Sequence, residues 1–399
     1  MRVATLLVAL FAAPVSIHAI TIETVPVGNP ANAPDVQGFS SIGGVDYEYD
    51  VGKYEVTNAQ YVAFLNAVDP TGTNPRGLYN SEMNTDARGG ITFASGAING
   101  AKYSAKAGRA NNPVVFVSFF DAARFTNWLH NGQGAANTED GAYQLDGGTP
   151  IPTNGDFVAR KVTASWTLPT IDEWYKAAYH KNDGITGNYF DYPTSSDAAP
   201  TATAPPGGSN SANFSFVVNG LTDAGAYLNS TSPYGTFDQG GNVWEWTDNL
   251  LGLESRHVAG GSWMNAASYL AASGQTNATL ASGEFNTIGF RVARVEPGLL
   301  PGDYNLDGYV DAADYTIWRD TLGSFEDLRA NGDDTGPSAG IIDDADYDFW
   351  KTNFGQAAGS GATSPAASAT RSAIPEPASL LLMLVALCAQ LASLRVARP

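Results

Sequence analysis

Cysteine is almost absent from this chain, and the shortage limits its chemistry. Only one of the 399 residues is a cysteine, Cys388, and it lies in an apolar run near the C-terminus. The rest of the chain therefore has no disulfide and no cysteine metal site. Histidine is also scarce. His130, His180 and His257 are the only histidines beyond residue 19, and none pairs at i, i+3 or i, i+4, so we expect surface or capping residues rather than metal ligands.

Positive charge is the second shortage. Lysine and arginine total 21 against 40 acidic residues, which gives a formal charge of −19 and a pI near 4.4. Such a chain repels phosphate backbones and anionic lipid surfaces, so we expect no nucleic acid partner. Metal cations suit it better. The 43 glycines and 22 prolines indicate many turns and long loops rather than a helical bundle.

The first nineteen residues have the pattern of a secretory signal peptide. One early basic residue, Arg2, is followed by an apolar run and by small residues that end at Ala19. We expect the chain to be exported, with a mature protein that begins near Ile20. A buried first strand is the alternative, but the run is unpatterned and stands at the extreme terminus.

A second apolar run, Ser379 to Leu394, lies near the C-terminus and is followed by basic residues. It is uncharged and slightly shorter than the roughly 20 residues that span a bilayer. A Pro-Glu-Pro triplet at 375–377 precedes it. Together these elements, 375–399, resemble the PEP-CTERM sorting signal, which implies recognition and cleavage by a membrane exosortase. An ordinary membrane anchor at the tail is the alternative.

Low-complexity and turn-rich stretches divide the rest of the chain. Residues 356–374 are rich in Ala, Ser, Gly and Thr and almost free of large apolar side chains, which predicts a flexible linker. Two prolines and two glycines within residues 296–302 mark another boundary. The sequence therefore predicts a large domain at 20–295 and a small one at 302–355.

The small domain contains an internal repeat. The segment Ala313–Arg319 recurs as Ala345–Lys351, and each copy is followed by a glycine suited to a helix C-cap. The loop before the first copy spaces oxygen ligands as calcium requires, with a glycine at its sixth position for the turn. The ligands that this spacing predicts are Asp303, Asn305, Asp307, the carbonyl of Tyr309, Asp311 and Asp314. A solvated acidic loop is the alternative.

Two acidic loops with short helices resemble a dockerin type I module, an all-α pair of EF-hand-like units, over residues 302–355. The resemblance implies calcium as cofactor and a cohesin-like protein as partner. The second loop departs from the pattern, because Pro337 and its neighbours stand where acidic ligands belong. Its predicted ligands are Asp333, Asp343 and Asp346, with Asn331 or Asp334 as alternatives at its start. Thirteen acidic residues against three basic ones would oppose compaction without bound cations.

Three helix starts are legible in the large domain. Thr57, Ser118 and Thr170 each stand three residues before a side chain that completes a capping box. After Thr57, apolar residues at i, i+3, i+4 and i+7 predict one buried face over residues 61–68. Short glycine-rich strands and loops fill the rest, so we predict an α+β domain with much irregular structure.

Several phrases of the large domain resemble the formylglycine-generating enzyme family, also called sulfatase-modifying factors, over about residues 22–295. They include YEVTNAQYVAFLN, TLPTIDEWYKAA, GNVWEW, AGGSW and GFRVAR, in the family's order. The resemblance implies a compact fold related to the C-type lectin fold, with calcium sites. The residues that match those sites are Gly241, Val243 and Glu245 for one, and Asn213 with the carbonyl of Phe214 for another. Without the family, Glu245 is a core carboxylate paired with Arg291.

The oxidases of that family hold copper(I) with two thiolates, five residues apart, and convert a substrate cysteine to formylglycine with O₂. Here the two positions are Asn265 and Leu270. Soft thiolates suit copper(I), and neither an amide nor an alkyl side chain replaces them. We therefore expect no copper and no formylglycine chemistry by that route. The sulfoxide-synthase branch of the superfamily holds iron with three histidines, largely from a helical domain that is missing here.

The cleft that receives the substrate peptide in that family can persist without the metal. The residues predicted to line it are Trp263, Asn265, Tyr269, Leu270 and Arg291. We hypothesise a non-catalytic binding or scaffold protein of the cell envelope, with a peptide or glycan ligand in this cleft. Two alternatives stay open, an oxidoreductase of altered chemistry and a purely structural envelope protein.

Overall fold

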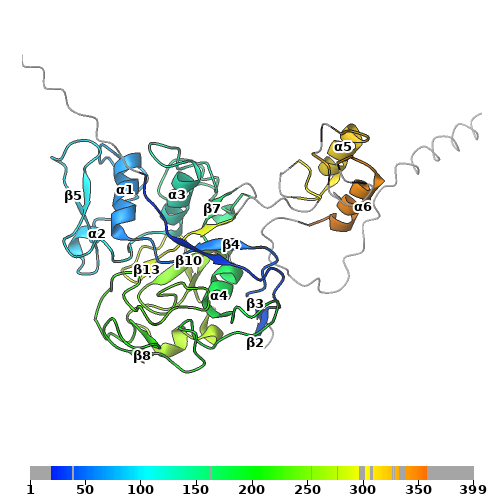
Figure 1. Cartoon of the computed structure of the whole chain (residues 1–399). Helices are drawn as coiled ribbons and strands as arrows, with labels where there is room; N and C mark the ends of the chain where they lie inside the picture. The colour runs from blue at the N-terminus through cyan, green and yellow to red at the C-terminus, as the bar shows by residue number, and fades with distance from the viewer. Residues whose placement is uncertain are drawn as a thin grey trace, which may run out of the picture. The chain divides into compact units, whose positions relative to one another are not determined.

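The computed structural model of the chain describes residues 19–356 apart from short gaps (Figure 1). The gaps are 38–39, 162–163, 253, 276, 296–301, 306–308, 326, 328, 332–337 and 339. Nearly all of the predicted signal peptide and linker, the whole sorting segment, and the predicted ligands Asp307 and Asp333 lie outside the described residues. The chain divides into two compact units, Met1–Ala362 and Thr363–Pro399, and the second is not among the described residues. Within the described part, no helix is long and apolar enough to cross a membrane.

Short strands and a few helices alternate over residues 24–294. The helices are α1 (Asn58–Val68), α2 (Glu82–Thr85), α3 (Phe119–His130) and α4 (Ile171–Tyr179). The strands are β1 (Thr24–Val27), β2 (Asp35–Gln37), β3 (Ser40–Ile42), β4 (Tyr49–Gly52), β5 (Ile91–Phe93), β6 (Tyr103–Ala105), β7 (Trp166–Thr167), β8 (Thr201–Ala202), β9 (Ser211–Ala212), β10 (Trp244–Leu250), β11 (Ser255–Ala259), β12 (Asn277–Leu280), β13 (Ile288–Gly289) and β14 (Ala293–Arg294). The domain therefore contains both helices and strands, mixed along the chain, with much irregular structure between them.

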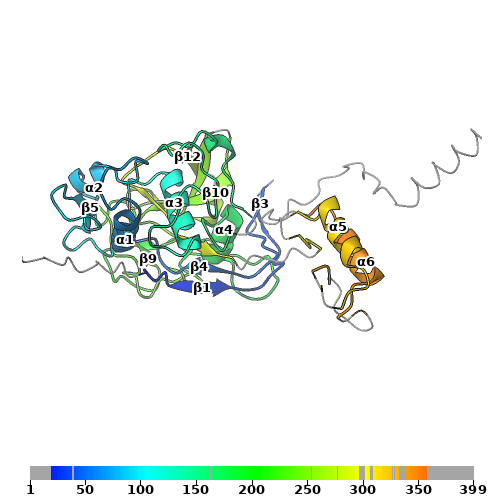
Figure 2. The ribbon, with the colours of Figure 1, turned by 90° about the horizontal axis from the view of Figure 1, so that it is seen from above.

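Two four-stranded sheets organise this domain. The first has the order β1-β4-β14-β7 and is antiparallel throughout. The second has the order β12-β11-β10-β13, in which β10 and β13 run parallel. Neighbouring strands of the first sheet come from distant parts of the chain, because β4 ends at Gly52 and β14 begins at Ala293. This sheet therefore joins the two ends of the domain, and β1 and β4 lie side by side in Figure 2.

The three predicted helix starts are confirmed. Thr57, Ser118 and Thr170 each accept a main-chain N–H bond from the residue three positions on, and each capping box is complete. Such a cap is worth about 1 kcal/mol of stability. α1 and α3 lie side by side (Figures 1 and 2) and bury a cluster of rings between them. Phe64 and Phe125 meet there edge to face, with 5.4 Å between ring centroids.

The C-terminal part of the described chain forms a pair of short helices, α5 (Ala312–Thr321) and α6 (Asp344–Asn353). The two helices exchange hydrogen bonds in a reciprocal way. Trp318 Nε1 donates to the carbonyl of Asp343 at 2.8 Å, and Trp350 Nε1 donates to the carbonyl of Asp311 at 3.0 Å. Each tryptophan thus reaches the N-cap residue of the other helix, and the internal repeat of the sequence is visible as a structural repeat.

Candidate functional site

The stretch where the family carries its thiolates follows β11 and begins with a tight glycine turn. Gly260 has a φ of 96°, and a Cβ there would lie 2.7 Å from the carbonyl oxygen of Gln239. Glycine is needed because any side chain would collide with that backbone. Five residues on, Asn265 Oδ1 accepts hydrogen bonds from Ser262 N at 3.0 Å and Ser262 Oγ at 2.6 Å. The amide of Asn265 therefore closes a local turn.

Leu270 occupies the second thiolate position and lies in the interior. Its side chain is fully buried and belongs to a small apolar cluster with Ala212 and Phe214. Its carbonyl oxygen accepts a hydrogen bond from the Tyr179 hydroxyl at 3.0 Å. One position thus supplies a hard amide oxygen that is already engaged, and the other supplies no donor atom. These residues do not fit copper(I).

Apolar side chains remain exposed around this turn. Trp263 is buried, and Phe216 stands edge-on to its ring with 5.5 Å between centroids. Tyr269 is 40% exposed and lies edge-on to Trp244. Asn265, which lies between Trp263 and Tyr269 in the sequence, is half-buried. The exposed apolar side chains of this region are Phe216, Val217, Val218, Met264 and Tyr269. The predicted cleft is therefore an apolar surface with a buried tryptophan beneath it.

Arg291 was predicted among the residues that line the cleft, but it lies in the core. Its Nε is 2.5 Å from Glu245 Oε2 and its Nη2 is 2.6 Å from Glu245 Oε1, and both side chains are fully buried. Trp174 Nε1 also donates to Oε2, at 2.7 Å. The other guanidinium donors reach the carbonyls of Gly52 and Phe237, both at 2.8 Å. This is the contact expected of a core carboxylate. The calcium role of Glu245 stays a prediction.

A line of buried polar side chains runs close to that ion pair. Asn242 Nδ2 donates to Glu55 Oε1 at 3.0 Å, and Asn213 Nδ2 donates to Asn242 Oδ1 at 3.2 Å. Among the described residues, Glu55 Oε2 and Asn213 Oδ1 have no hydrogen-bond partner. Burial, and then the nearby carboxylates of Asp238 and Glu245, raise the pKa of Glu55 well above its usual range. Unpartnered buried oxygens in acidic surroundings are suited to a cation.

The residues predicted for the two calcium sites of this domain lie next to each other. The N–H of Asn242 donates to the carbonyl of Asn213 at 2.8 Å, and a Cβ at Gly241 would lie 2.3 Å from that same oxygen. The carbonyl of Phe214 accepts the N–H of Val217 at 3.1 Å. Val243 is buried in the main core beside them. The unpartnered Oδ1 of Asn213 is the atom in this group that best fits a calcium ligand.

Sequence reasoning missed Glu55 and Asp238, which join this group from elsewhere in the chain. Burial raises the pKa of Asp238 to about 6, and the carboxylate accepts the N–H of Gly225 at 2.6 Å. Asp238 has a φ of 58°, a backbone region that asparagine and aspartate tolerate better than most residues. Glu55 stands in the phrase YEVTNAQYVAFLN, and Asp238 stands four positions before Asn242. These phrases were the available signal, but the sequence analysis gave neither acidic residue a role.

A cavity of about 360 Å³ opens beside the first sheet and was also not predicted. Its lining includes Val27, Glu48, Asp50, Asn182, Tyr234 and Arg294. A buried polar network adjoins it at Tyr234, whose hydroxyl lies 2.8 Å from His180 Nδ1.

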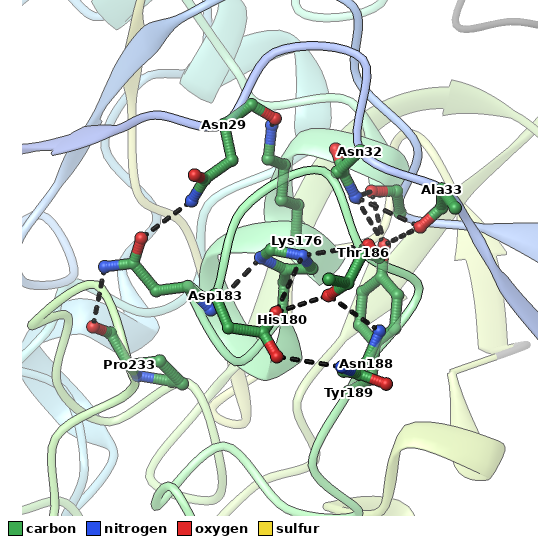
Figure 3. Close-up of polar contacts among 12 residues, drawn as sticks. Asn29, Asn32, Ala33, Lys176, His180, Asp183, Thr186, Asn188, Tyr189 and Pro233 are labelled. Carbon is green, nitrogen blue, oxygen red and sulfur yellow. Dashed lines mark hydrogen bonds and ion pairs between the residues drawn. The ribbon is translucent and has the colours of Figure 1, made fainter.

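Figure 3 shows this network around the C-terminal end of α4. His180 is the C-cap residue of the helix, and its Nε2 lies 3.1 Å from the carbonyl of Thr186. Lys176 Nζ donates to the carbonyl of Asn29 at 2.9 Å, and burial lowers the pKa of this lysine to about 8. His180 thus has the capping position that the sequence predicted, although it is fully buried rather than at the surface.

Acidic side chains of the C-terminal helical pair are partly buried and bonded to the main chain. Asp314 is fully buried and accepts hydrogen bonds from Asn305 N at 3.0 Å and Asp311 N at 2.8 Å. Asp303 and Asp346 are also buried, and Tyr309 is exposed. The N–H of Asp343 donates to Asp346 in the same way as in the first helix.

The calcium prediction for this helical pair rests on loops that are described only in part. Asn331, an alternative first ligand of the second loop, has a buried Oδ1 without a hydrogen-bond partner among the described residues. Among all described residues, those of the large domain included, no group of three or more His, Cys, Asp or Glu side chains is arranged to hold a metal. Calcium binding by the loops stays a prediction.

Comparison with known proteins identifies the large domain. The chain is similar in structure to Treponema denticola variable protein 1, with 18% identity, a TM-score of 0.45, and coverage of 71% of this chain and 99% of that chain. It is similar to CarF, with 20% identity, a TM-score of 0.45, and coverage of 69% and 99%. It is also similar to PvdO from Pseudomonas aeruginosa, with 19% identity, a TM-score of 0.37, and coverage of 68% and 91%. No curated protein matches it.

A sequence profile decides the family. The profile of the "Sulfatase-modifying factor enzyme 1-like domain" matches residues 45–296, which is more than half of the chain. The match begins just before β4 and ends just after β14, so it takes in both four-stranded sheets except β1. The chain therefore belongs to the family of proteins with a sulfatase-modifying factor enzyme 1-like domain.

Proposed function

We propose that this chain is an exported binding protein of the cell envelope, built on the sulfatase-modifying factor fold without its oxidase chemistry. One observation supports it above the others. Asn265 closes a turn with Ser262, and Leu270 is packed into an apolar cluster, at the two positions where copper(I) needs sulfur. A surface that keeps exposed aromatic side chains but no metal ligands is suited to binding rather than to oxidation.

Restoring the thiolates tests the metal part of this proposal. We expect the wild-type mature chain to take up no stoichiometric copper(I) in competition with a chromogenic copper(I) chelator. The double variant N265C/L270C should bind about one ion, because two thiolates form a soft two-coordinate site. The variant N265S/L270A is the matched control without sulfur. Copper uptake by the wild-type chain equal to that of the cysteine variant would contradict the proposal.

We also propose calcium as the cofactor, at Asn213 in the large domain and at the acidic loops of the C-terminal helical pair. The support in the large domain is the unpartnered, buried Oδ1 of Asn213 beside Glu55 and Asp238. Calcium supplies charge and takes oxygen ligands, and this chain's residues would hold and orient it. Equilibrium dialysis with radioactive calcium should count fewer bound ions in N213S than in the wild-type chain. The variant N188S, at an exposed asparagine, serves as control.

The location and the partners complete the proposal. The signal peptide exports the chain, an exosortase cleaves the C-terminal segment, and the dockerin-like helical pair docks a cohesin-like protein. The support comes from the sequence patterns alone. Replacement of the Pro-Glu-Pro triplet at 375–377 by alanines should leave the C-terminal segment attached, which the mass of the protein from cell fractions reports. An unchanged mass would contradict the sorting role.

A further inference from the structure

Three basic side chains gather at the loop before β5 without a carboxylate partner. Arg88, Lys106 and Arg109 form no ion pair with any described residue, although the chain as a whole is strongly acidic. Lys106 Nζ donates to the carbonyl of Gly89 at 2.8 Å, and Arg109 Nη2 donates to the carbonyl of Ala87 at 3.0 Å. Main-chain carbonyls hold these side chains in place, and the charge of one nearby carboxylate, Asp86, acts on Lys106 and offsets only part of the positive charge.

One carboxylate does lie close to this cluster, but it is already engaged. Asp86 Oδ1 accepts the N–H of Arg88 at 2.7 Å, and Asp86 Oδ2 accepts Asn286 Nδ2 at 3.4 Å. The carboxylate therefore caps its own loop and contacts the segment after β12. With one acid against three bases, the loop is a local positive region.

Arg88 connects this positive region to the exposed apolar side chains of the candidate site. Its guanidinium lies over the Trp263 ring, 4.7 Å from the centroid, and Nη2 is 3.4 Å from Asn219 Oδ1. Its Nε is buried and has no hydrogen-bond partner among the described residues. The contact with the ring holds the guanidinium charge beside the exposed apolar side chains, which suits a carboxylate ligand.

Phe216 contacts the same Trp263 ring, with 5.5 Å between the ring centroids. It is 53% exposed, and its N–H donates to the carbonyl of Trp263 at 2.8 Å. Ser215 and Phe216 have φ values of 52° and 60°, a region that is rare for a bulky side chain. Such a backbone conformation is unfavourable for non-glycine residues, and the fold around the two residues offsets its cost. The loop therefore holds an aromatic ring outward against its local preference.

We propose that this surface, formed by Arg88, Lys106, Arg109, Phe216 and Met264, binds a polypeptide segment in which acidic residues flank an aromatic or aliphatic side chain. The inference rests on the proposed function, that the domain binds rather than oxidises. Arginine and aromatic side chains are the residues that contribute most to protein interfaces. The aliphatic groups of Met264, Val217 and Val218 offer nothing to sugar hydroxyls, which favours a peptide over a glycan. The positive region selects acidic segments.

The test uses the full mature chain and two synthetic peptides. The first alternates glutamate with phenylalanine and leucine, with blocked termini and a fluorescent label, and the second replaces every glutamate by lysine. Fluorescence anisotropy should give saturable binding of the acidic peptide, at least about tenfold tighter than of the basic one, and weaker as salt rises. Equal binding of the two peptides, or no binding of the acidic one, overturns the inference.

Single substitutions locate the binding surface. R88Q and F216A should each weaken binding of the acidic peptide about tenfold, since each removes a central contact. The matched controls are R319Q and F157A, because both side chains are exposed elsewhere. Equal melting temperatures of all four variants would show that the fold is kept. Unchanged affinity of R88Q and F216A overturns the inference.

Two further measurements separate this inference from the proposed function. Oxidation of a cysteine peptide by the wild-type chain would overturn the proposed function, whatever the acidic peptide does. Absence of oxidation together with absence of peptide binding overturns only this inference. Sedimentation reports self-association, and a dimer of the wild-type chain that F216A abolishes would assign the surface to a second copy and overturn the peptide assignment.

Discussion

The large domain and the C-terminal helical pair treat buried acids differently. In the domain, Glu245 is paired with Arg291 at 2.5 Å and Glu173 with Arg160 at 2.8 Å. In the helical pair, the fully buried Asp314 accepts hydrogen bonds from main-chain N–H groups. Both regions use capping boxes at their helix starts. They differ in whether a positively charged side chain is paired with the buried carboxylate.

The three basic residues of the helical pair are occupied elsewhere. Arg319 contacts the exposed Asp320, Arg329 contacts the exposed Asp327, and Lys351 lies over the Tyr347 ring at 5.6 Å from its centroid. The central carboxylates of the domain are therefore paired with arginines, whereas the buried aspartates of the helical pair are bonded to main-chain N–H groups. The comparison predicts that the helical pair depends on added cations more strongly than the core of the domain does.

Breaking the central ion pair of the domain should have the largest effect. R291M leaves Glu245 buried without its cation, and we expect a loss of about 3–5 kcal/mol in the free energy of unfolding. Urea denaturation measures it. The double variant E245Q/R291M should recover part of the loss, since the uncompensated charge is gone. A loss below about 1 kcal/mol for R291M would mean that the pair is not what closes the core.

Removing a predicted calcium ligand should affect only the helical pair. At a calcium concentration 100 times the dissociation constant, binding contributes about 2.7 kcal/mol. D314N should abolish this contribution, and calorimetry should show a lower transition for the helical pair with the domain unchanged. The variant D320N is the control, because Asp320 is exposed and paired with Arg319. If chelation and D314N leave both transitions in place, the comparison of the two regions fails.

A carboxyl pair at the start of α3 should make the domain pH-sensitive. Burial, and then the charge of Asp121, raise the pKa of Glu284 to about 7, and burial raises that of Asp121 to about 6. A raised folded-state pKa means that the folded state binds more protons. The free energy of unfolding should therefore fall as pH rises from about 4.5 to 7, by roughly 1–2 kcal/mol.

The variant E284Q reports on that pH dependence. It should flatten the curve between pH 4.5 and 7, measured by urea denaturation at several pH values. The variant E254Q serves as control, because Glu254 is at the exposed turn between β10 and β11. Part of the slope should survive in E284Q, because burial also raises the pKa of Asp238 to about 6. A slope in E284Q equal to that of the wild-type chain would assign the pH dependence to other groups.

The helix caps should have the smallest effect and should act within one region. S118A removes the N-cap of α3, and we expect a loss of about 1 kcal/mol in the domain. S95A, at an exposed serine away from the three capping boxes, is the matched control. A shift in the transition of the helical pair with S118A would show that the two regions do not unfold independently.

The sequence predicted what is local and missed what is distant. The three helix starts were found because a capping box lies within four residues. The first sheet was not predicted, because its strands are two to four residues long and β4 pairs with β14, more than two hundred residues away. Short strands carry no periodic pattern, so their pairing depends on tertiary contacts.

The candidate site shows the same limit. Asn265 and Leu270 were found because they stand at fixed positions in a phrase. Arg88 was missed, since a single arginine in a loop has no pattern, and its contact with Trp263 joins residues far apart in the sequence. Arg291 was predicted to line the cleft and, without the family, to pair with a core Glu245, and the structure has the second arrangement. The choice between them depends on packing, which the sequence pattern does not record.

The most direct test of the central claim is oxidation of a thiol. The purified mature chain is incubated under air with added copper(I) and a cysteine-containing peptide, and the peptide is analysed by mass spectrometry. We expect the peptide's cysteine to be recovered without conversion to formylglycine, at the same level as in a sample without protein. Formation of the aldehyde by the wild-type chain, in proportion to its concentration, would contradict the account.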